Sequence, residues 1–318
     1  MIDPDAAAPG EIYRDPVYDG ATDPTVVVDA EGTWWMHYTQ RRANHPAPGP
    51  GVAWVHGSRI GVARSADGQR WEYRGTLEPA PGGLALHEGA PPANVDETHW
   101  APDVIHDGER WRMYLTEIEG VPTEWAGHPR RIVEYVSDDL AHWERREPLA
   151  LDSDLVIDAA VAHCPDGLWR LWYKDEAADS VTKVAVSRDP ATWEPGGTAV
   201  GGRPHEGPYV FALGGRWWML TDEWRGMAVH HSPDSVRWER QGGADEVILG
   251  ESGPASRGVQ IGRHGMVVVR DDEALLYYFT HPWWDGSEIS EADAAHQRRS
   301  AVHVARLRVD GARLVCER

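Results

Sequence analysis

Short apolar runs alternate with aromatic-rich runs along the chain, and each pair is joined by a brief turn rich in Gly, Asp or Glu. This order of apolar run, turn and aromatic run occurs five times, at residues 23–39, 101–116, 158–174, 206–221 and 264–280. Short β-type runs separated by turn residues are typical of antiparallel hairpins. The pattern therefore predicts five hairpins of common form.

A second motif follows the first four hairpins. The pattern Ser-x-Asp-x-x-x-Trp-Glu occurs at residues 65–72, 137–144, 187–194 and 232–239, each time after another β-like run. Ser and Asp favour tight turns, so the motif predicts a turn between two further antiparallel strands. Because its tryptophans recur at identical spacing, we expect them to pack between neighbouring repeats; they are Trp71, Trp143, Trp193 and Trp238.

Together the two motifs define five units of four short strands each. Four-stranded units repeated around an axis are the signature of a β-propeller. No long amphipathic helical pattern competes with this interpretation, and no linker separates the units. The sequence predicts an all-β fold, a five-bladed β-propeller with four antiparallel strands per blade and a single domain over residues 1–318. The expected blades span roughly residues 21–77, 100–150, 156–199, 205–245 and 262–318.

The long connections all fall where they would share one face of this propeller. They are residues 40–57, 78–99, 117–131 and 281–299. Functional residues concentrate on loops carried by a rigid scaffold, so this is the predicted working face. The first strand of each blade starts there, which makes the residues at these starts neighbours around the axis: Asp23, Asp103, Asp158, Glu206 and His264. Crowded carboxylates are costly unless they perform chemistry or bind a cation.

Composition limits the classes of molecule that the protein is expected to bind. The chain of 318 residues has a formal net charge of −20, which argues against nucleic acid and anionic membranes as partners. A small oligosaccharide or glycoside is compatible with that charge. Seventeen Trp and ten Tyr against two Phe suit stacking on sugar faces with hydrogen bonding at the ring edge. Cys164 and Cys316 are too few for a disulfide scaffold, and with neither a signal peptide nor a membrane span apparent, we expect a cytoplasmic protein.

The chemistry that suits clustered carboxylates is glycoside hydrolysis, which needs two carboxyl groups in opposite protonation states. Three segments, Thr22-Asp23-Pro24, Trp100-Ala101-Pro102-Asp103 and Glu206-Gly207-Pro208, resemble the three catalytic signatures of glycoside hydrolase family 43. They occur in the family's order and in phase with the repeat. The resemblance extends from Asp23 to the last strands.

This resemblance implies an inverting mechanism. Asp23 would be the general base, Glu206 the general acid, and Asp103 the group that raises the pKa of Glu206 and orients it. His264 resembles the family's axial histidine, which often lies beside a calcium ion or a water cluster. No cofactor is required by the resemblance; a structural calcium ion is compatible with it, and no metal ligand is assigned.

The same resemblance places an arginine of blade five against the sugar, and either Arg298 or Arg299 fills that position. The tryptophans outside the periodic motifs are candidates for the sugar cleft. The predicted substrate-binding set is Trp54, His56, Trp100, Asp158, Trp224, His264 and Arg299.

The expected activity is exo-acting release of a terminal pentosyl group, either α-L-arabinofuranosyl or β-xylosyl. Two other functions remain open: a carbohydrate-binding propeller without catalysis, and a glycosyl-transfer or phosphorolysis enzyme on the same fold. Fructan-cleaving relatives carry Asn-Asp-Pro at the first signature, where this chain has Thr22 before Asp23.

Overall fold

The chain folds almost entirely into antiparallel β-strands. The computed structural model describes residues 10–92, 95–250, 259–270, 273–284 and 294–318. Within them, helical structure is limited to η1 (Glu176–Ala178) and α1 (Ala294–Gln297). None of the helices in these residues has the length and apolar character that crossing a membrane requires.

Five four-stranded meanders follow one another along the chain, each paired in sequence order. The first contains β2 (Ala21–Val28), β3 (Trp34–Gln40), β4 (Arg59–Ser65) and β5 (Glu72–Ala80); the second β7 (Glu97–His106), β8 (Trp111–Glu119), β9 (Arg131–Ser137) and β10 (His142–Pro148); the third β11 (Val156–His163), β12 (Trp169–Asp175), β13 (Val181–Ser187) and β14 (Glu194–Val200). The fourth contains β15 (Glu206–Leu213), β16 (Arg216–Asp222), β17 (Met227–Ser232) and β18 (Glu239–Arg240); the fifth β19 (Val259–Arg270), β20 (Glu273–His281), β21 (Ala301–Asp310) and β22 (Arg313–Glu317).

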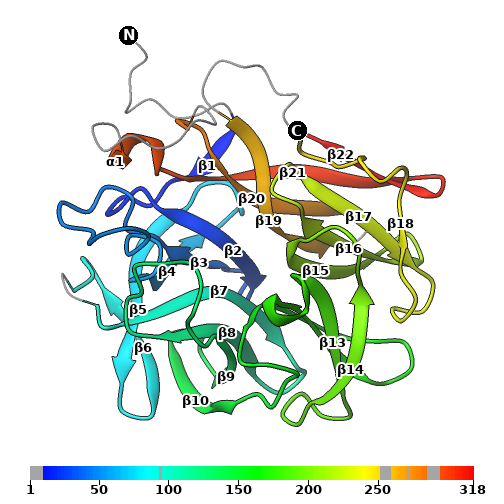
Figure 1. The fold of residues 1–318 in the computed structure, drawn as a ribbon, viewed down its shortest axis with the longest axis horizontal. Helices are drawn as coiled ribbons and strands as arrows, with labels where there is room; N and C mark the ends of the chain where they lie inside the picture. The colour runs from blue at the N-terminus through cyan, green and yellow to red at the C-terminus, as the bar shows by residue number, and fades with distance from the viewer. Residues whose placement is uncertain (1–9, 93–94, 251–258, 271–272, 285–293) are drawn as a thin grey trace.

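The first strands of these meanders pack against one another in a closed ring. Strand β2 contacts β7, β7 contacts β11, β11 contacts β15, β15 contacts β19, and β19 returns to β2. Figure 1 shows the chain passing around a common centre in sequence order, from blue through green to red. The all-β, propeller-like architecture predicted from the repeats is therefore confirmed.

Two strands add to this pattern at its edges. β1 (Glu11–Tyr13) pairs with β21, which attaches the beginning of the described chain to the fifth meander. β6 (Gly83–Glu88) forms a hairpin with β5 and pairs with β10, so the first two meanders merge into one nine-stranded sheet. The expectation that residues 78–99 form only a loop was wrong, because residues 83–88 form a strand whose Leu84 and Leu86 side chains pack on the core between these meanders.

The Ser-x-Asp-x-x-x-Trp-Glu segments form the predicted turns. In the first of them, Ser65 Oγ donates to Asp67 Oδ1 at 3.0 Å, and the Asp67 carboxylate accepts the backbone N–H groups of Gln69 and Arg70. Each motif tryptophan meets, edge to face, an aromatic or histidine ring on the second strand of the neighbouring meander, as the repeat predicted. The pairs are Trp71–Tyr277, Trp143–His37, Trp193–Tyr114 and Trp238–Trp172, with ring centroids 5.8–6.2 Å apart.

Candidate active site

Every innermost strand is interrupted by a β-bulge at the same place. The pairing register shifts between Thr22 and Thr25 in β2, and equivalent shifts occur in β7, β11, β15 and β19. One residue in each bulge has a positive φ; these are Asp23, Ala101, Asp158, Gly207 and His264. Bulges re-aim side chains at strand ends, and in β2, β11 and β19 they turn Asp23, Asp158 and His264 into one cavity.

The bulges define which positions of the five strands are equivalent. Asp23 and Asp158 both occupy the positive-φ position, whereas Glu206 precedes it by one residue and Asp103 follows it by two. Gly207 fits its position for a physical reason, because a Cβ there would approach the His264 ring to 3.0 Å. The three signatures therefore do not present their acidic residues at equivalent points.

Asp103 occupies the same position relative to its bulge as Thr25 does in β2. Like Thr25, Asp103 accepts a backbone N–H from the next innermost strand. Thr25 Oγ1 accepts the backbone N–H of Val104 at 3.2 Å, across the junction between β2 and β7. Asp103 Oδ2 accepts the backbone N–H of Val161 at 2.8 Å, across the next junction, between β7 and β11. Burial raises the pKa of Asp103 to about 7. Asp103 thus connects two meanders within the core.

A cavity of about 390 Å³ lies over the bulges. Six of the sequence-predicted residues line it: Asp23, Trp100, Asp158, Glu206, Trp224 and His264. The loops at 40–57 and 117–131 contribute Val55, Trp125 and Arg130, in agreement with the predicted working face.

The remaining sequence-predicted residues lie outside this lining. Asp103 is buried between strands, and Trp54 packs with Trp100 in an apolar cluster beneath the loop. His56 is also buried and contacts Trp100, with the two rings tilted by 36° and their centroids 4.7 Å apart. Of the two blade-five arginine candidates, Arg298 lies over Trp54, and Arg299 Nε lies 3.1 Å from Asp19 Oδ2.

Sequence reasoning missed most of the cationic and apolar side chains of the cavity. Ile157 and Arg263 occupy the position before the bulge that Glu206 occupies in β15, and their cross-strand partners also point inward. Aligning the five hairpins at this single position would have found them. Trp125 was among the tryptophans expected as candidates for the cleft. The missed lining residues are Arg41, Val55, Arg130, Ile157, Lys174, Glu176, Arg263, Phe279 and His281.

Asp23 is held as a carboxylate. Its Oδ2 accepts a hydrogen bond from Thr22 Oγ1 at 3.0 Å and lies 3.5 Å from an Arg41 guanidinium nitrogen, while Oδ1 lies 3.5 Å from His264 Nδ1. Burial alone would raise the pKa of Asp23, but Arg41 and His264 outweigh burial and lower it. An ionised carboxylate at the axis is suited to accepting a proton.

Glu206 lies beside the Lys174 ammonium and near the Asp158 carboxyl group, which contacts the backbone of Gly207. Lys174 Nζ lies 3.2 Å from Glu206 Oε2 and 3.3 Å from Glu176 Oε1. Burial would raise the pKa of Glu206, but the Lys174 ammonium outweighs burial and lowers it. Asp158 Oδ2 accepts the backbone N–H of Gly207 at 3.0 Å, and burial, with the Glu206 charge adding to it, raises the pKa of Asp158 to about 6.

His264 stands among several carboxyl groups. Burial would lower its pKa, but the charges of Asp158, Asp23 and Glu206 raise it. Its backbone N–H donates to Asp222 Oδ2 at 3.2 Å, and burial, together with the Glu206 charge, raises the pKa of Asp222 to about 7. Among the described residues, no group of three or more His, Cys, Asp or Glu side chains is arranged to hold a metal ion, so we derive no step through calcium.

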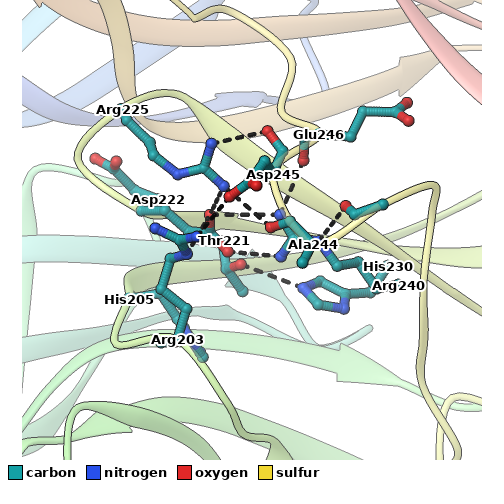
Figure 2. A network of polar contacts seen from close by, with 12 residues as sticks. Arg203, His205, Thr221, Asp222, Arg225, His230, Arg240, Ala244, Asp245 and Glu246 are labelled. Atoms are coloured by element: carbon teal, nitrogen blue, oxygen red, sulfur yellow. Dashed lines mark hydrogen bonds and ion pairs between the residues drawn. The ribbon is translucent and has the colours of Figure 1, made fainter.

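Trp224 forms one wall of the cavity and is carried by a short loop that a buried charge anchors. Trp224 has a φ of 57°, and its backbone N–H donates to Asp222 Oδ1 at 2.7 Å. The adjacent Glu223 carboxylate is buried and lies within 2.6 Å of both Arg225 and Arg240. Arg203 Nε lies 3.7 Å from the same carboxylate. Figure 2 shows Arg203, Arg225 and Arg240, which come from three segments of the chain.

Comparisons with known proteins identify the same fold. No protein-family model and no curated protein sequence matches the chain. Among solved structures, a thermostable family-43 glycoside hydrolase superposes with a TM-score of 0.68 at 17% identity, covering 96% of this chain and 95% of that one. An α-L-arabinofuranosidase from Lactobacillus brevis gives 0.64 at 17% identity, covering 94% of each chain.

A GH43_1 enzyme from Xanthomonas citri, complexed with xylotriose, gives 0.66 at 15% identity and covers 96% of this chain and 92% of that one. The resemblance to family 43 that the three signatures suggested is therefore confirmed at the level of the fold. At these identities the likeness establishes the architecture.

Proposed function

We propose that this protein is a glycoside hydrolase built on a five-bladed propeller, with the five meanders as blades. One observation carries the proposal: three acidic side chains from three different innermost strands, Asp23, Asp158 and Glu206, line a single cavity at the ring centre. Their environments push their pKa values in different directions, which is what acid–base cleavage of a glycosidic bond requires.

In this proposal Asp23 is the general base, since Arg41 and His264 keep it ionised and able to take a proton from water. Glu206 is the general acid that protonates the leaving oxygen. Asp158 takes the tuning role that the sequence suggested for Asp103, because it contacts the backbone beside Glu206 from within the cavity.

Glu206 must hold a proton to act as the acid. Asp158 and Glu206 carry charges of the same sign in one buried site, so each raises the pKa of the other. In the free protein a proton taken up at mildly acidic pH lies on Asp158, whose pKa is raised to about 6, while the Lys174 ammonium lowers the pKa of Glu206. Lys174 also lies 3.3 Å from Glu176 Oε1, and in this proposal a shift of Lys174 from Glu206 towards Glu176 on substrate binding raises the pKa of Glu206, so that the proton moves from Asp158 to Glu206.

The finer proposal is inverting, exo-acting release of terminal α-L-arabinofuranosyl or β-xylosyl groups. It is supported by the α-L-arabinofuranosidase and β-xylosidase structures that share the fold and by the cavity of about 390 Å³. For inversion, the Asp23 and Glu206 carboxyl groups must stand roughly 6.5–9.5 Å apart to admit water; about 5 Å would favour retention. NMR of the first-formed product anomer distinguishes the two outcomes.

Aryl glycosides test the proposal directly. Wild-type protein should hydrolyse nitrophenyl arabinofuranosides or xylosides, and Asp23→Asn should lower kcat by about 10²-fold or more on every substrate. Glu206→Gln should impair natural oligosaccharides much more than nitrophenyl glycosides, whose leaving group needs little protonation. Glu273→Gln, which removes an exposed carboxylate paired with Arg306, is the matched control and should behave as wild type. If no glycoside in the panel is cleaved, the hydrolase proposal is rejected.

A further inference from the structure

The cavity contains four cationic side chains, although the protein as a whole has a net charge of −20. Three of them lie within 3.5 Å of a carboxylate of the same cavity; they are Arg41, Arg130 and Lys174. The fourth, Arg263, is near enough to the buried Asp222 that its charge acts to lower the pKa of that carboxyl against the effect of burial, but it makes no ion pair in the described part of the chain. Arg263 is therefore the cation of the cavity that is best placed to pair with a ligand.

The position of Arg263 is fixed by its strand. It immediately precedes the bulge in β19, where the backbone N–H of His264 donates to Asp222 Oδ2. Its side chain is half-buried and lies over the Trp284 ring at 6.0 Å. A guanidinium that is partly withdrawn from water without an acceptor is unfavourable in the free protein, and a bound anion would relieve that cost.

Arg41 lies on the same side of the cavity. Its guanidinium is 5.4 Å from the centre of the Phe279 ring, and Phe279 is the cross-strand partner of Arg263. Both arginines line the cavity together with His281, and their charges add to burial in lowering the pKa of His281 to about 3. Two guanidinium groups so placed suit a planar anion, because each can bind a carboxylate through two parallel hydrogen bonds.

On the basis of the proposed glycosidase function, we infer that the substrate is an acidic oligosaccharide whose uronic acid carboxylate is bound by Arg263, with Arg41 beside it. A sugar chain that carries both a terminal pentosyl group and a uronic acid would supply a partner for the two catalytic carboxylates and for Arg263. Asp23 and Glu206 act on the pentosyl bond, and the carboxylate of the neighbouring sugar occupies the Arg263 side. The net negative charge of the protein still opposes long polyanions, so the ligand is a short chain.

Calorimetry at low ionic strength measures this preference without requiring turnover. D-Glucuronate and D-galacturonate should bind about tenfold or more tightly than D-glucose and D-galactose, as expected for charged hydrogen bonds. Arg263→Met should abolish the difference, and Arg263→Lys should keep only part of it. Arg216→Met is the matched control, because Arg216 also lies over a tryptophan, Trp218 at 5.6 Å, but outside the cavity.

Equal affinity for uronates and neutral sugars would overturn the inference, and so would a preference that persists in Arg263→Met. A second calorimetry series uses inorganic phosphate as the ligand. Phosphate binding that requires Arg263, without any preference for uronates, would overturn the carboxylate assignment and indicate phosphorolysis. A uronate preference in a protein that cleaves no glycoside would support the inference while rejecting the hydrolase proposal, so the two failures are distinguishable.

Discussion

The Glu206 proton is controlled by two neighbours that act in opposite directions. Lys174 favours the ionised form of Glu206, and Asp158 favours the protonated form. Asp158→Asn removes a like charge, so the pKa of Glu206 should fall and the alkaline limb of the pH–rate profile should move to lower pH. Lys174→Met removes the cation and should move the same limb to higher pH. Profiles of kcat/KM with a natural oligosaccharide measure both shifts, and limbs that move together would contradict this assignment.

Asp103 should affect stability and leave the pH–rate profile unchanged. Its pKa is about 7 in the folded protein and ordinary, near 4, in the unfolded chain. The folded state therefore binds more protons between these values, so the contribution of Asp103 to stability is full below about pH 4 and is lost as the pH rises towards 7. Asp103→Asn retains an oxygen for the Val161 N–H, and its stability relative to wild type should increase over that interval.

Urea unfolding of wild type and Asp103→Asn at pH 5 and pH 8 measures this difference. Asp103→Leu is the companion variant, since it removes the acceptor and should lower the free energy of unfolding by about 1–3 kcal/mol at both pH values. A pH–rate shift in Asp103→Asn comparable to that in Asp158→Asn would return the tuning role to Asp103.

At the scale of elements, the loop between β16 and β17 presents Trp224 to the cavity only because Glu223 is anchored below it. Removing one partner of a buried charge cluster leaves the others uncompensated. Glu223→Gln should lower the free energy of unfolding by about 3–5 kcal/mol and raise KM by releasing Trp224. Thermal unfolding and steady-state kinetics measure the two effects. Glu273→Gln, at an exposed pair, should cost at most about 1 kcal/mol, and equal losses in the two variants would contradict the anchoring role.

The elements themselves could be predicted well from the sequence, because hairpins and turns are local. Alternating runs located the meanders, and the identical spacing of Trp71 and its equivalents revealed the packing between them. The bulges were missed, since a bulge adds a residue to one strand and shifts every position that follows it. A signal was present: Pro24, Pro102 and Pro208 each follow the positive-φ residue, and alignment on these prolines pairs Asp23 with Ala101.

The candidate site could be predicted only in part for the same reason. Asp23 and Glu206 stood out as motifs, and Asp158 followed from its place at the start of an innermost strand, so all three cavity residues were predicted. Lys174 and Arg263 carry no motif, and their inward orientation follows from the cross-strand register and the bulges. Trp54 and His56 were expected to contact sugar, but the loop that carries them packs them beneath Trp100. Whether a loop aromatic faces the cavity or the core is decided by tertiary packing, which spacing does not encode.

At the scale of the whole molecule, the ring closes between its last and first meanders. Strand β19 contacts β2, β1 pairs with β21, and Trp71 meets Tyr277, whose hydroxyl donates to the Gly68 carbonyl at 3.0 Å. Each of the other junctions joins meanders that are consecutive in the chain. The closing junction joins the two ends of the chain and is held by the β1–β21 pairing, by the Ser300 N–H to Asp19 carbonyl hydrogen bond and by side-chain packing, so the cavity at the ring centre depends on these contacts.

We therefore predict that the closing junction is the first to open when its packing is weakened. Trp71→Leu should lower the free energy of unfolding by about 2–4 kcal/mol, less than a fully buried Trp→Ala, because Trp71 is only partly buried. Hydrogen exchange should accelerate in β2 and β19–β21 and remain slow in β11–β14, on the far side of the ring. Trp143→Leu is the matched control, since its contact with His37 joins consecutive meanders. Exchange that accelerates evenly around the ring in both variants would show that the propeller opens only as a single unit.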